Sequence, residues 1–225
     1  MVRVARNTIV RKHGTTMVPV KNSYPGAFRG NFPLIISGYT TDSGLGDYYK
    51  RASLRLSRSC IKFDLPHAIF PWRKQKDWVA GCALKPALIL HVLKTFRRPV
   101  LWIDADAEIF QYPQIFDTPV FSMALHSATG HWLSGTLYLN CQTIEFVEAW
   151  HNNTKSSTPD EISLLHTYNR FEAKKRAPKL KILPSSYNTV VHTKTKLTNV
   201  IIGHYIRKNI AGSRGVEAVE LNEKF

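Results

Sequence analysis

The strongest constraint on the fold is a short apolar run that leads directly into two carboxylates, VLWIDAD at positions 100–106. The run Val100 to Ile103 predicts a strand buried on both faces, as in a parallel sheet. Residues i and i+2 of an extended chain point to the same side, so we expect Asp104 and Asp106 to converge. Ligands bind at the carboxyl ends of strands in open α/β sheets, and paired carboxylates suit Mg²⁺ or Mn²⁺. The alternative is a polar turn in which an aspartate caps a helix.

The balance of charge indicates what kind of partner the chain has. Its 225 residues are 44% hydrophobic, which is enough for one domain with a core. Lys and Arg number 31 against 16 Asp and Glu, a formal net charge of +15. This excess favours a polyanionic partner, such as nucleic acid, an anionic membrane surface or a phosphorylated substrate. The alternative is that the charge only aids solubility.

The cysteines and the N-terminal region indicate the compartment. Cys60, Cys82 and Cys141 are widely spaced and form no CxxC pair, so neither a zinc site nor a disulfide framework is suggested. The basic stretch 1–13 has no apolar run long enough for a signal peptide, and we expect no window of transmembrane length. These features predict a cytoplasmic protein without disulfides.

Strand and helix patterns alternate along the chain, which predicts an α/β fold with a mainly parallel sheet. We expect strands at 32–39, 68–70, 100–103, 120–125, 131–140, 180–183 and 199–204, and helices that begin near Asp47, Lys85, Thr143 and Asp160. Residues 1–30 are expected to form a basic arm or an edge hairpin, 31–215 the single domain and 216–225 a tail.

The loop 71–78 combines aromatic and basic residues. Trp72 and Trp78 flank Arg73, Lys74 and Lys76. Exposed aromatic rings stack on bases and sugars, so one interpretation is a platform for nucleic acid or sugar. The alternative is that both indoles fold back into the core.

The order of the motifs resembles the GT-A fold of metal-dependent glycosyltransferases that use nucleotide sugars. The quoted stretches are Tyr39-Thr40-Thr41 at a strand end, Lys85-Pro86 at a helix start, Asp104-Ala105-Asp106, Ser134-Gly135-Thr136 within a strand, Asp160-Glu161 at a helix start, and Ile201 to Tyr205. The resemblance implies a Rossmann-like, mixed but mainly parallel sheet flanked by helices. It also implies a nucleotide-diphosphate sugar, UDP-linked, as the donor, with Mn²⁺ or Mg²⁺ as the cofactor.

The resemblance also implies roles for individual residues. Asp104, Asp106 and His204 would bind the metal, and Asp104 has the donor's ribose as an alternative partner. Lys85, Arg207 and Lys208 would neutralise the diphosphate, Tyr39 and Thr40 would line the nucleotide pocket, and Ser134 and Gly135 would lie against the donor. Asp160 or Glu161 would act near the sugar, as a base or as a ligand of its hydroxyls. For His204, Lys85 and Asp160 the alternatives are an ordinary strand end, a solvated lysine and a helix cap.

The acceptor is predicted from the basic residues that the donor does not require. They include Arg73, Lys74, Lys76, Lys174, Lys175 and Arg176. Such clusters contact phosphates, so we expect double-stranded DNA, with a hydroxymethylated pyrimidine as the acceptor. This resembles the bacteriophage glycosyltransferases that modify DNA in the host cytoplasm, and Trp72 would then support an extruded base. The alternatives are a peripheral transferase for lipopolysaccharide or a surface glycan, and a basic nucleic-acid-binding module without enzyme activity.

Overall fold

The computed structural model describes residues 10–12, 15–17, 33–41, 48–117, 121–128, 130–154, 158–192 and 194–205. Its helices are α1 (Tyr48–Lys62), α2 (Trp78–Cys82), α3 (Lys85–Phe96), α4 (Ile144–Asn153) and α5 (Asp160–Ala173). Its strands are β1 (Val10–Lys12), β2 (Thr15–Met17), β3 (Leu34–Thr40), β4 (His67–Trp72), β5 (Val100–Ile103), β6 (Ala107–Ile109), β7 (Met123–Ala128), β8 (His131–Leu139), β9 (Leu180–Ile182), β10 (Thr189–Val190) and β11 (Ile202–His204).

A six-stranded sheet in the order β4-β3-β5-β8-β7-β9 forms the centre of the fold. Strand β3 runs parallel to β4 and β5, and β9 runs parallel to β7, whereas β8 is antiparallel to both β5 and β7. A smaller sheet, β10-β11-β6, lies beside it. The predicted fold class, a mixed and mainly parallel sheet flanked by helices, is therefore confirmed.

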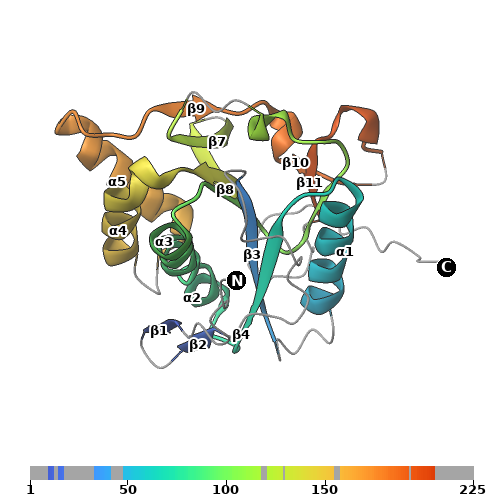
Figure 1. Ribbon diagram of the computed structural model, residues 1–225, viewed down its shortest axis with the longest axis horizontal. Helices are drawn as coiled ribbons and strands as arrows, with labels where there is room; N and C mark the ends of the chain where they lie inside the picture. Colours follow the sequence, from blue (N-terminus) through green and yellow to red (C-terminus); the bar gives the residue numbers. More distant parts are fainter. Residues whose placement is uncertain are drawn as a thin grey trace, which may run out of the picture.

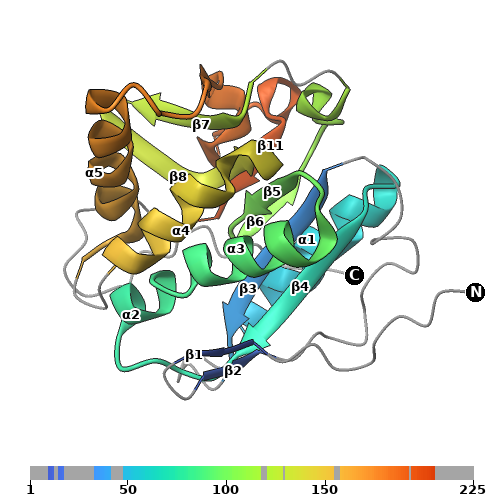
Figure 2. The ribbon, with the colours of Figure 1, turned by 60° about the vertical axis from the view of Figure 1, so that its left-hand side comes forward.

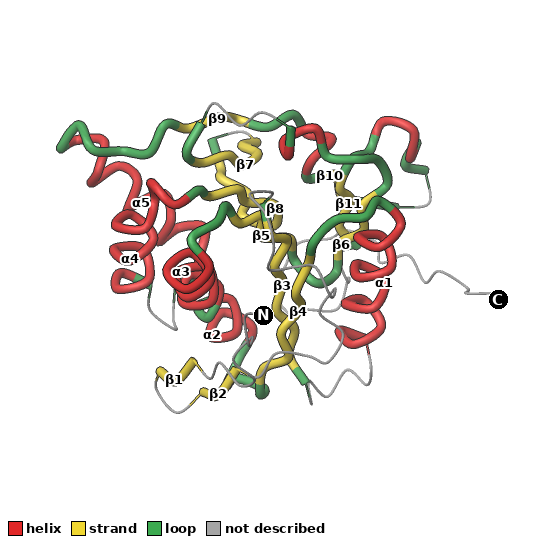
Figure 3. The backbone as a smooth tube through the Cα atoms, viewed as in Figure 1, coloured by secondary structure: helices red, strands yellow, loops and turns green. Residues whose placement is uncertain are grey.

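Helices cover the sheet on both sides. In Figures 1 and 3, α2 to α5 lie on one side of the large sheet, and α1 lies on the other with the small sheet. Alternate residues of one strand enter different cores: Leu34 packs with residues of α3 and α4, whereas Ile35 packs with residues of α1. All four residues of β5 are at most 2% exposed, which confirms that this strand is buried on both faces.

Trp72 belongs to the core, which corrects the prediction that it supports an extruded base. Its side chain is only 6% exposed and stacks on Trp102, with 6.3 Å between the ring centres. The indole fills the space above Gly38, where a β-carbon would lie 2.0 Å from the Trp72 ring. Its Nε1–H donates to Thr40 Oγ1 at 3.0 Å. Trp78, in contrast, is 53% exposed.

Two further expectations differ from the structure or are only partly described. The stretch 78–96 is long and apolar enough to cross a membrane, contrary to the prediction for this chain, although half of it is buried within the fold. It is divided between α2 and α3. Within the predicted arm 1–30, β1 and β2 pair as an antiparallel hairpin. The other residues of that arm and the whole tail 216–225 lie outside the described residues.

Candidate active site

The candidate site lies where several elements end close to one another. Strand β5 ends at Ile103 before the two aspartates, and α3 and α5 begin at Lys85 and Asp160. Because β3 is parallel to β5, its end at Thr40 reaches the same edge of the sheet. The small strands β6 and β11 lie beside this edge (Figure 2). The elements therefore gather there as expected for an α/β fold.

The two aspartates converge through a turn rather than along an extended strand, which corrects the reason given for their convergence. The Ala107 N–H donates to the Asp104 carbonyl at 3.0 Å and closes the turn. The chain then continues as β6, which pairs with β11 so that Ala107 lies opposite His204. Tyr205 N–H also donates to the Asp106 carbonyl at 3.1 Å. These backbone bonds bring His204 to the aspartates across a long interval of sequence.

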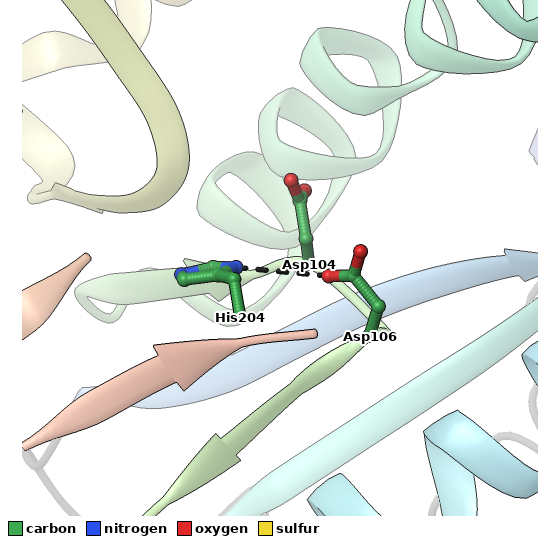
Figure 4. Close-up of side chains that lie close together, drawn as sticks. All are labelled: Asp104, Asp106 and His204. Carbon is green, nitrogen blue, oxygen red and sulfur yellow. Dashed lines mark ion pairs between the residues drawn. The ribbon is translucent and has the colours of Figure 1, made fainter. Parts of the chain in front are cut away.

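The three predicted metal ligands come together as a triad (Figure 4). One ligand atom from each of Asp104, Asp106 and His204 lies within 4.8 Å of the others. His204 Nδ1 is 3.6 Å from Asp106 Oδ1, a buried oxygen with no hydrogen-bond partner among the described residues. Two carboxylates and an imidazole suit Mn²⁺, and the unpartnered oxygen leaves one lone-pair site for it. The residues present therefore fit a divalent cation.

The neighbours of the triad orient its ligand atoms. Asp104 Oδ1 accepts from Trp102 Nε1–H at 2.6 Å and lies 3.3 Å from Lys85 Nζ, so Oδ2 is the oxygen that faces Gly135. His204 Nε2 lies 3.2 Å from the hydroxyl of Thr136, which is fully buried. A hydroxyl that accepts from Nε2–H leaves the Nδ1 lone pair for a metal.

Lys85 is the centre of a buried ionic network. The residue is only 4% exposed, and its Nζ lies 2.8 Å from Asp160 Oδ2 and donates to Ser134 Oγ at 2.8 Å. Burial alone would lower the pKa of Lys85, but the carboxylates of Asp104 and Asp160 raise it above its ordinary value. The lysine is therefore a fixed positive charge and not the solvated side chain of the alternative interpretation. Asp160 is likewise buried and ion-paired rather than a plain cap.

Glu161 lies beside this network with a different environment. Its Oε1 accepts from the Ser134 backbone N–H at 3.1 Å. Burial raises the pKa of Glu161 above its ordinary value, and the charge of Lys85 partly opposes that rise. A carboxyl group with a raised pKa at a site edge is suited to proton transfer or to binding sugar hydroxyls.

Gly135 lets three side chains approach its backbone closely beside the triad. A β-carbon at this position would lie 2.9 Å from His204 Cε1, 3.0 Å from Asn188 Oδ1 and 3.2 Å from Asp104 Oδ2. Only a glycine therefore lets these three side chains approach the backbone at position 135 so closely. The chain's own side chains thus account for a glycine at position 135, and its contact with a donor stays a prediction.

Sequence reasoning missed several residues around the triad. Trp102, Thr136 and Asn188 contact or face it as described, and Arg55 donates to the Asp106 carbonyl at 3.3 Å. The signal for Trp102 was available, because a strand residue two positions before Asp104 points to the same side. The spacing in the sequence gives no such signal for Asn188 or Arg55.

The other predicted site residues lie in different surroundings. Tyr39 and Thr40 lie at the end of β3, and partial burial raises the pKa of Tyr39. Arg207 and Lys208 lie outside the described residues. Arg73, Lys74 and Lys76 are exposed close to α2, and Lys174, Lys175 and Arg176 are exposed at the end of α5, where Arg176 forms an ion pair with Glu145.

Comparison with solved structures identifies the fold. The chain matches a glycosyltransferase involved in the glycosylation of the major capsid of PBCV-1, with a TM-score of 0.58 and 11% identity over 81% of this chain and 94% of that chain. This chain therefore shares the fold of a glycosyltransferase. It also matches the glycosyltransferase GlyE of Streptococcus pneumoniae TIGR4, with a TM-score of 0.45 and 11% identity over 83% of this chain and 58% of that one. No family model and no curated protein matches the sequence.

Proposed function

We propose that this protein is a metal-dependent glycosyltransferase that moves a sugar from a nucleotide-diphosphate sugar to a hydroxyl acceptor. The observation that carries the proposal is the triad of Asp104, Asp106 and His204 beside the buried Lys85, at the strand ends of a fold shared with a glycosyltransferase. A cation site next to a fixed ammonium group suits a diphosphate, which gains negative charge as the glycosyl bond breaks.

Different residues of the site have different roles in this reaction. Asp104, Asp106 and His204 would hold Mn²⁺ or Mg²⁺, which when bound acts as a Lewis acid on the diphosphate leaving group. Lys85, fixed by Asp104 and Asp160, supplies a second positive charge to the same group. Glu161 accepts from the Ser134 N–H and orients a sugar hydroxyl or takes its proton.

The decisive experiment measures hydrolysis of a panel of nucleotide sugars, UDP-linked sugars first, with and without Mn²⁺. We expect Asp106→Ala to lower the rate by about 100-fold or more, because it removes a charge that fixes the cation. Asp117→Ala is the matched control, since the Asp117 carboxylate is exposed and accepts from the Tyr112 hydroxyl, which is not part of the site. Absence of Mn²⁺-dependent hydrolysis across the panel, or an unaffected Asp106→Ala variant, would refute the proposal.

The acceptor that we propose is a hydroxymethylated pyrimidine in double-stranded DNA. The support is the charge of +15 and the exposure of Arg73, Lys74 and Lys76 in the loop that leads into α2. Trp78, which is 53% exposed, replaces Trp72 as the aromatic ring available to a base. Lys174, Lys175 and Arg176 follow α5 and lie about 20 Å along the helix from Asp160, because a 14-residue helix rises ~1.5 Å per residue. They would therefore contact DNA at a distance from the site and not at the acceptor base.

Salt-dependent binding tests this acceptor. With Arg73, Lys74 and Lys76 all changed to Ala, the slope of log affinity against log salt should fall by about 3 if each contacts a phosphate. Lys94→Ala is the control, since Lys94 already pairs with Glu148 at 2.8 Å. Mass spectrometry of hydroxymethylated DNA after incubation with the donor panel should show an added sugar. Duplex DNA binding that is weak and insensitive to salt would exclude DNA.

A further inference from the structure

Asn188 is the residue near the triad whose chemistry the proposed function leaves unused. It follows the short 3-10 helix Ser185–Tyr187 and immediately precedes β10, which pairs with β11 so that Val190 lies opposite His204. Its side-chain Oδ1 is buried and has no hydrogen-bond partner within the described part of the chain. A buried acceptor without a partner destabilises a fold unless a group from outside the chain satisfies it, so what surrounds Asn188 Oδ1 decides whether it binds a ligand.

The surroundings of this oxygen indicate which ligand that is. Asn188 Oδ1 and Asp104 Oδ2 lie 3.0 Å and 3.2 Å from the point where a β-carbon of Gly135 would stand. The edge of the His204 ring lies 2.9 Å from the same point. The Asn188 oxygen therefore lies beside two members of the triad. A second buried oxygen without a hydrogen-bond partner, Asp106 Oδ1, belongs to the third member of the triad.

From this geometry we infer that the side-chain oxygen of Asn188 is a fourth protein ligand of the cation site, beside two carboxylate oxygens and one imidazole nitrogen. Amide carbonyl oxygens are ordinary ligands of hard divalent cations, which take six or more ligands, and three come from the triad. The inference rests on the proposed function, because it assumes that the triad holds a cation. A cation bound by both side chains would also supply the partner that Asn188 Oδ1 and Asp106 Oδ1 lack.

The test is a titration of the donor-free protein with Mn²⁺, in which the electron paramagnetic resonance signal of the free ion measures how much Mn²⁺ is bound. Asn188→Leu keeps the branched shape of the side chain but removes the oxygen, and it should weaken Mn²⁺ binding by about tenfold or more. Asn188→Asp restores an oxygen and adds charge, so it should bind Mn²⁺ at least as tightly as the wild type. Ser37→Ala is the control: Ser37 Oγ is also buried and unpartnered in the described structure, but it lies within β3.

Thermal unfolding without metal accompanies the titration. Asn188→Leu and Ser37→Ala should each unfold at or above the wild-type temperature, because each removes an unsatisfied polar atom. Wild-type affinity for Mn²⁺ in Asn188→Leu, or weakened affinity in Asn188→Asp, would overturn the inference about Asn188 alone. If the wild-type protein binds no Mn²⁺, the metal-dependent function fails together with it, so the two failures are distinguishable.

Discussion

Replacing Gly135 with alanine introduces a single methyl group into the space between the triad and Asn188. The new carbon would lie 2.9 Å from His204 Cε1, 3.0 Å from Asn188 Oδ1 and 3.2 Å from Asp104 Oδ2. Carbon atoms pack best at about 3.5–4.0 Å, so the imidazole has to retreat by about half an ångström or more. Overpacking of this kind costs about 1–3 kcal/mol of stability. Metal sites tolerate only about 0.2 Å of error in ligand distances, so we also expect Mn²⁺ affinity to fall by about 10- to 100-fold.

A second glycine provides the matched control for this substitution. A β-carbon at Gly81 would have Thr40 Oγ1 as its nearest contact, at 4.0 Å. Gly81 lies within α2, so Gly81→Ala should stabilise the protein by about 0.5–1 kcal/mol and leave Mn²⁺ binding unchanged. Urea unfolding and Mn²⁺ titration of both variants measure the two effects. If Gly135→Ala binds Mn²⁺ and hydrolyses the donor as the wild type does, the close approach at Gly135 has no role in the site.

Three other substitutions test the surroundings of the triad. Thr136→Val removes the hydroxyl beside His204 Nε2 and should weaken Mn²⁺ binding by about 10-fold or more. Thr136→Ser keeps a hydroxyl and should bind Mn²⁺ as the wild type does. Wild-type affinity in Thr136→Val would contradict the role of Thr136 in orienting His204. Lys85→Met leaves Asp160 buried without its cation and should cost about 3–5 kcal/mol in urea unfolding, and a loss below about 1 kcal/mol would show that the pair is not coupled. The raised pKa of Glu161 predicts a pH dependence if the reaction requires its ionised carboxylate. As the pH falls, kcat/KM should begin to decline at a pH above the ordinary pKa of glutamate, because Glu161 is protonated there. Glu161→Gln cannot be protonated in this way, so its residual activity should lack this decline.

The local features of the chain were predictable because they depend on neighbours in sequence. The apolar run at β5 requires burial on both faces, and the helices that begin at Lys85 and Asp160 follow from helix patterns. The choice of Asp104, Asp106 and His204 as one group relied on a resemblance, and the structure brings the three together. Their ligand role stays a prediction that the Mn²⁺ titrations test.

The two tryptophans of the loop 71–78 show why other features were not predictable. Both are equally apolar and lie among similar basic residues, yet Trp72 is 6% exposed and Trp78 is 53% exposed. The difference comes from Gly38, far away in the sequence, whose missing side chain leaves room for one indole. Burial of a large side chain depends on space supplied by another element, and spacing within the loop contains no information about it.

The sequence by itself determined that a buried strand ends in two carboxylates. It also determined that helices with charged residues in their first turns belong to the same α/β sheet fold. The tertiary structure alone decided how the carboxylates are arranged. A turn, and not an extended strand, brings Asp104 and Asp106 together. Strand β11 places His204 opposite Ala107. Lys85 is buried and forms ion pairs with Asp104 and Asp160. These arrangements depend on backbone pairing and desolvation between distant segments, whose free energies arise only when the whole fold has formed.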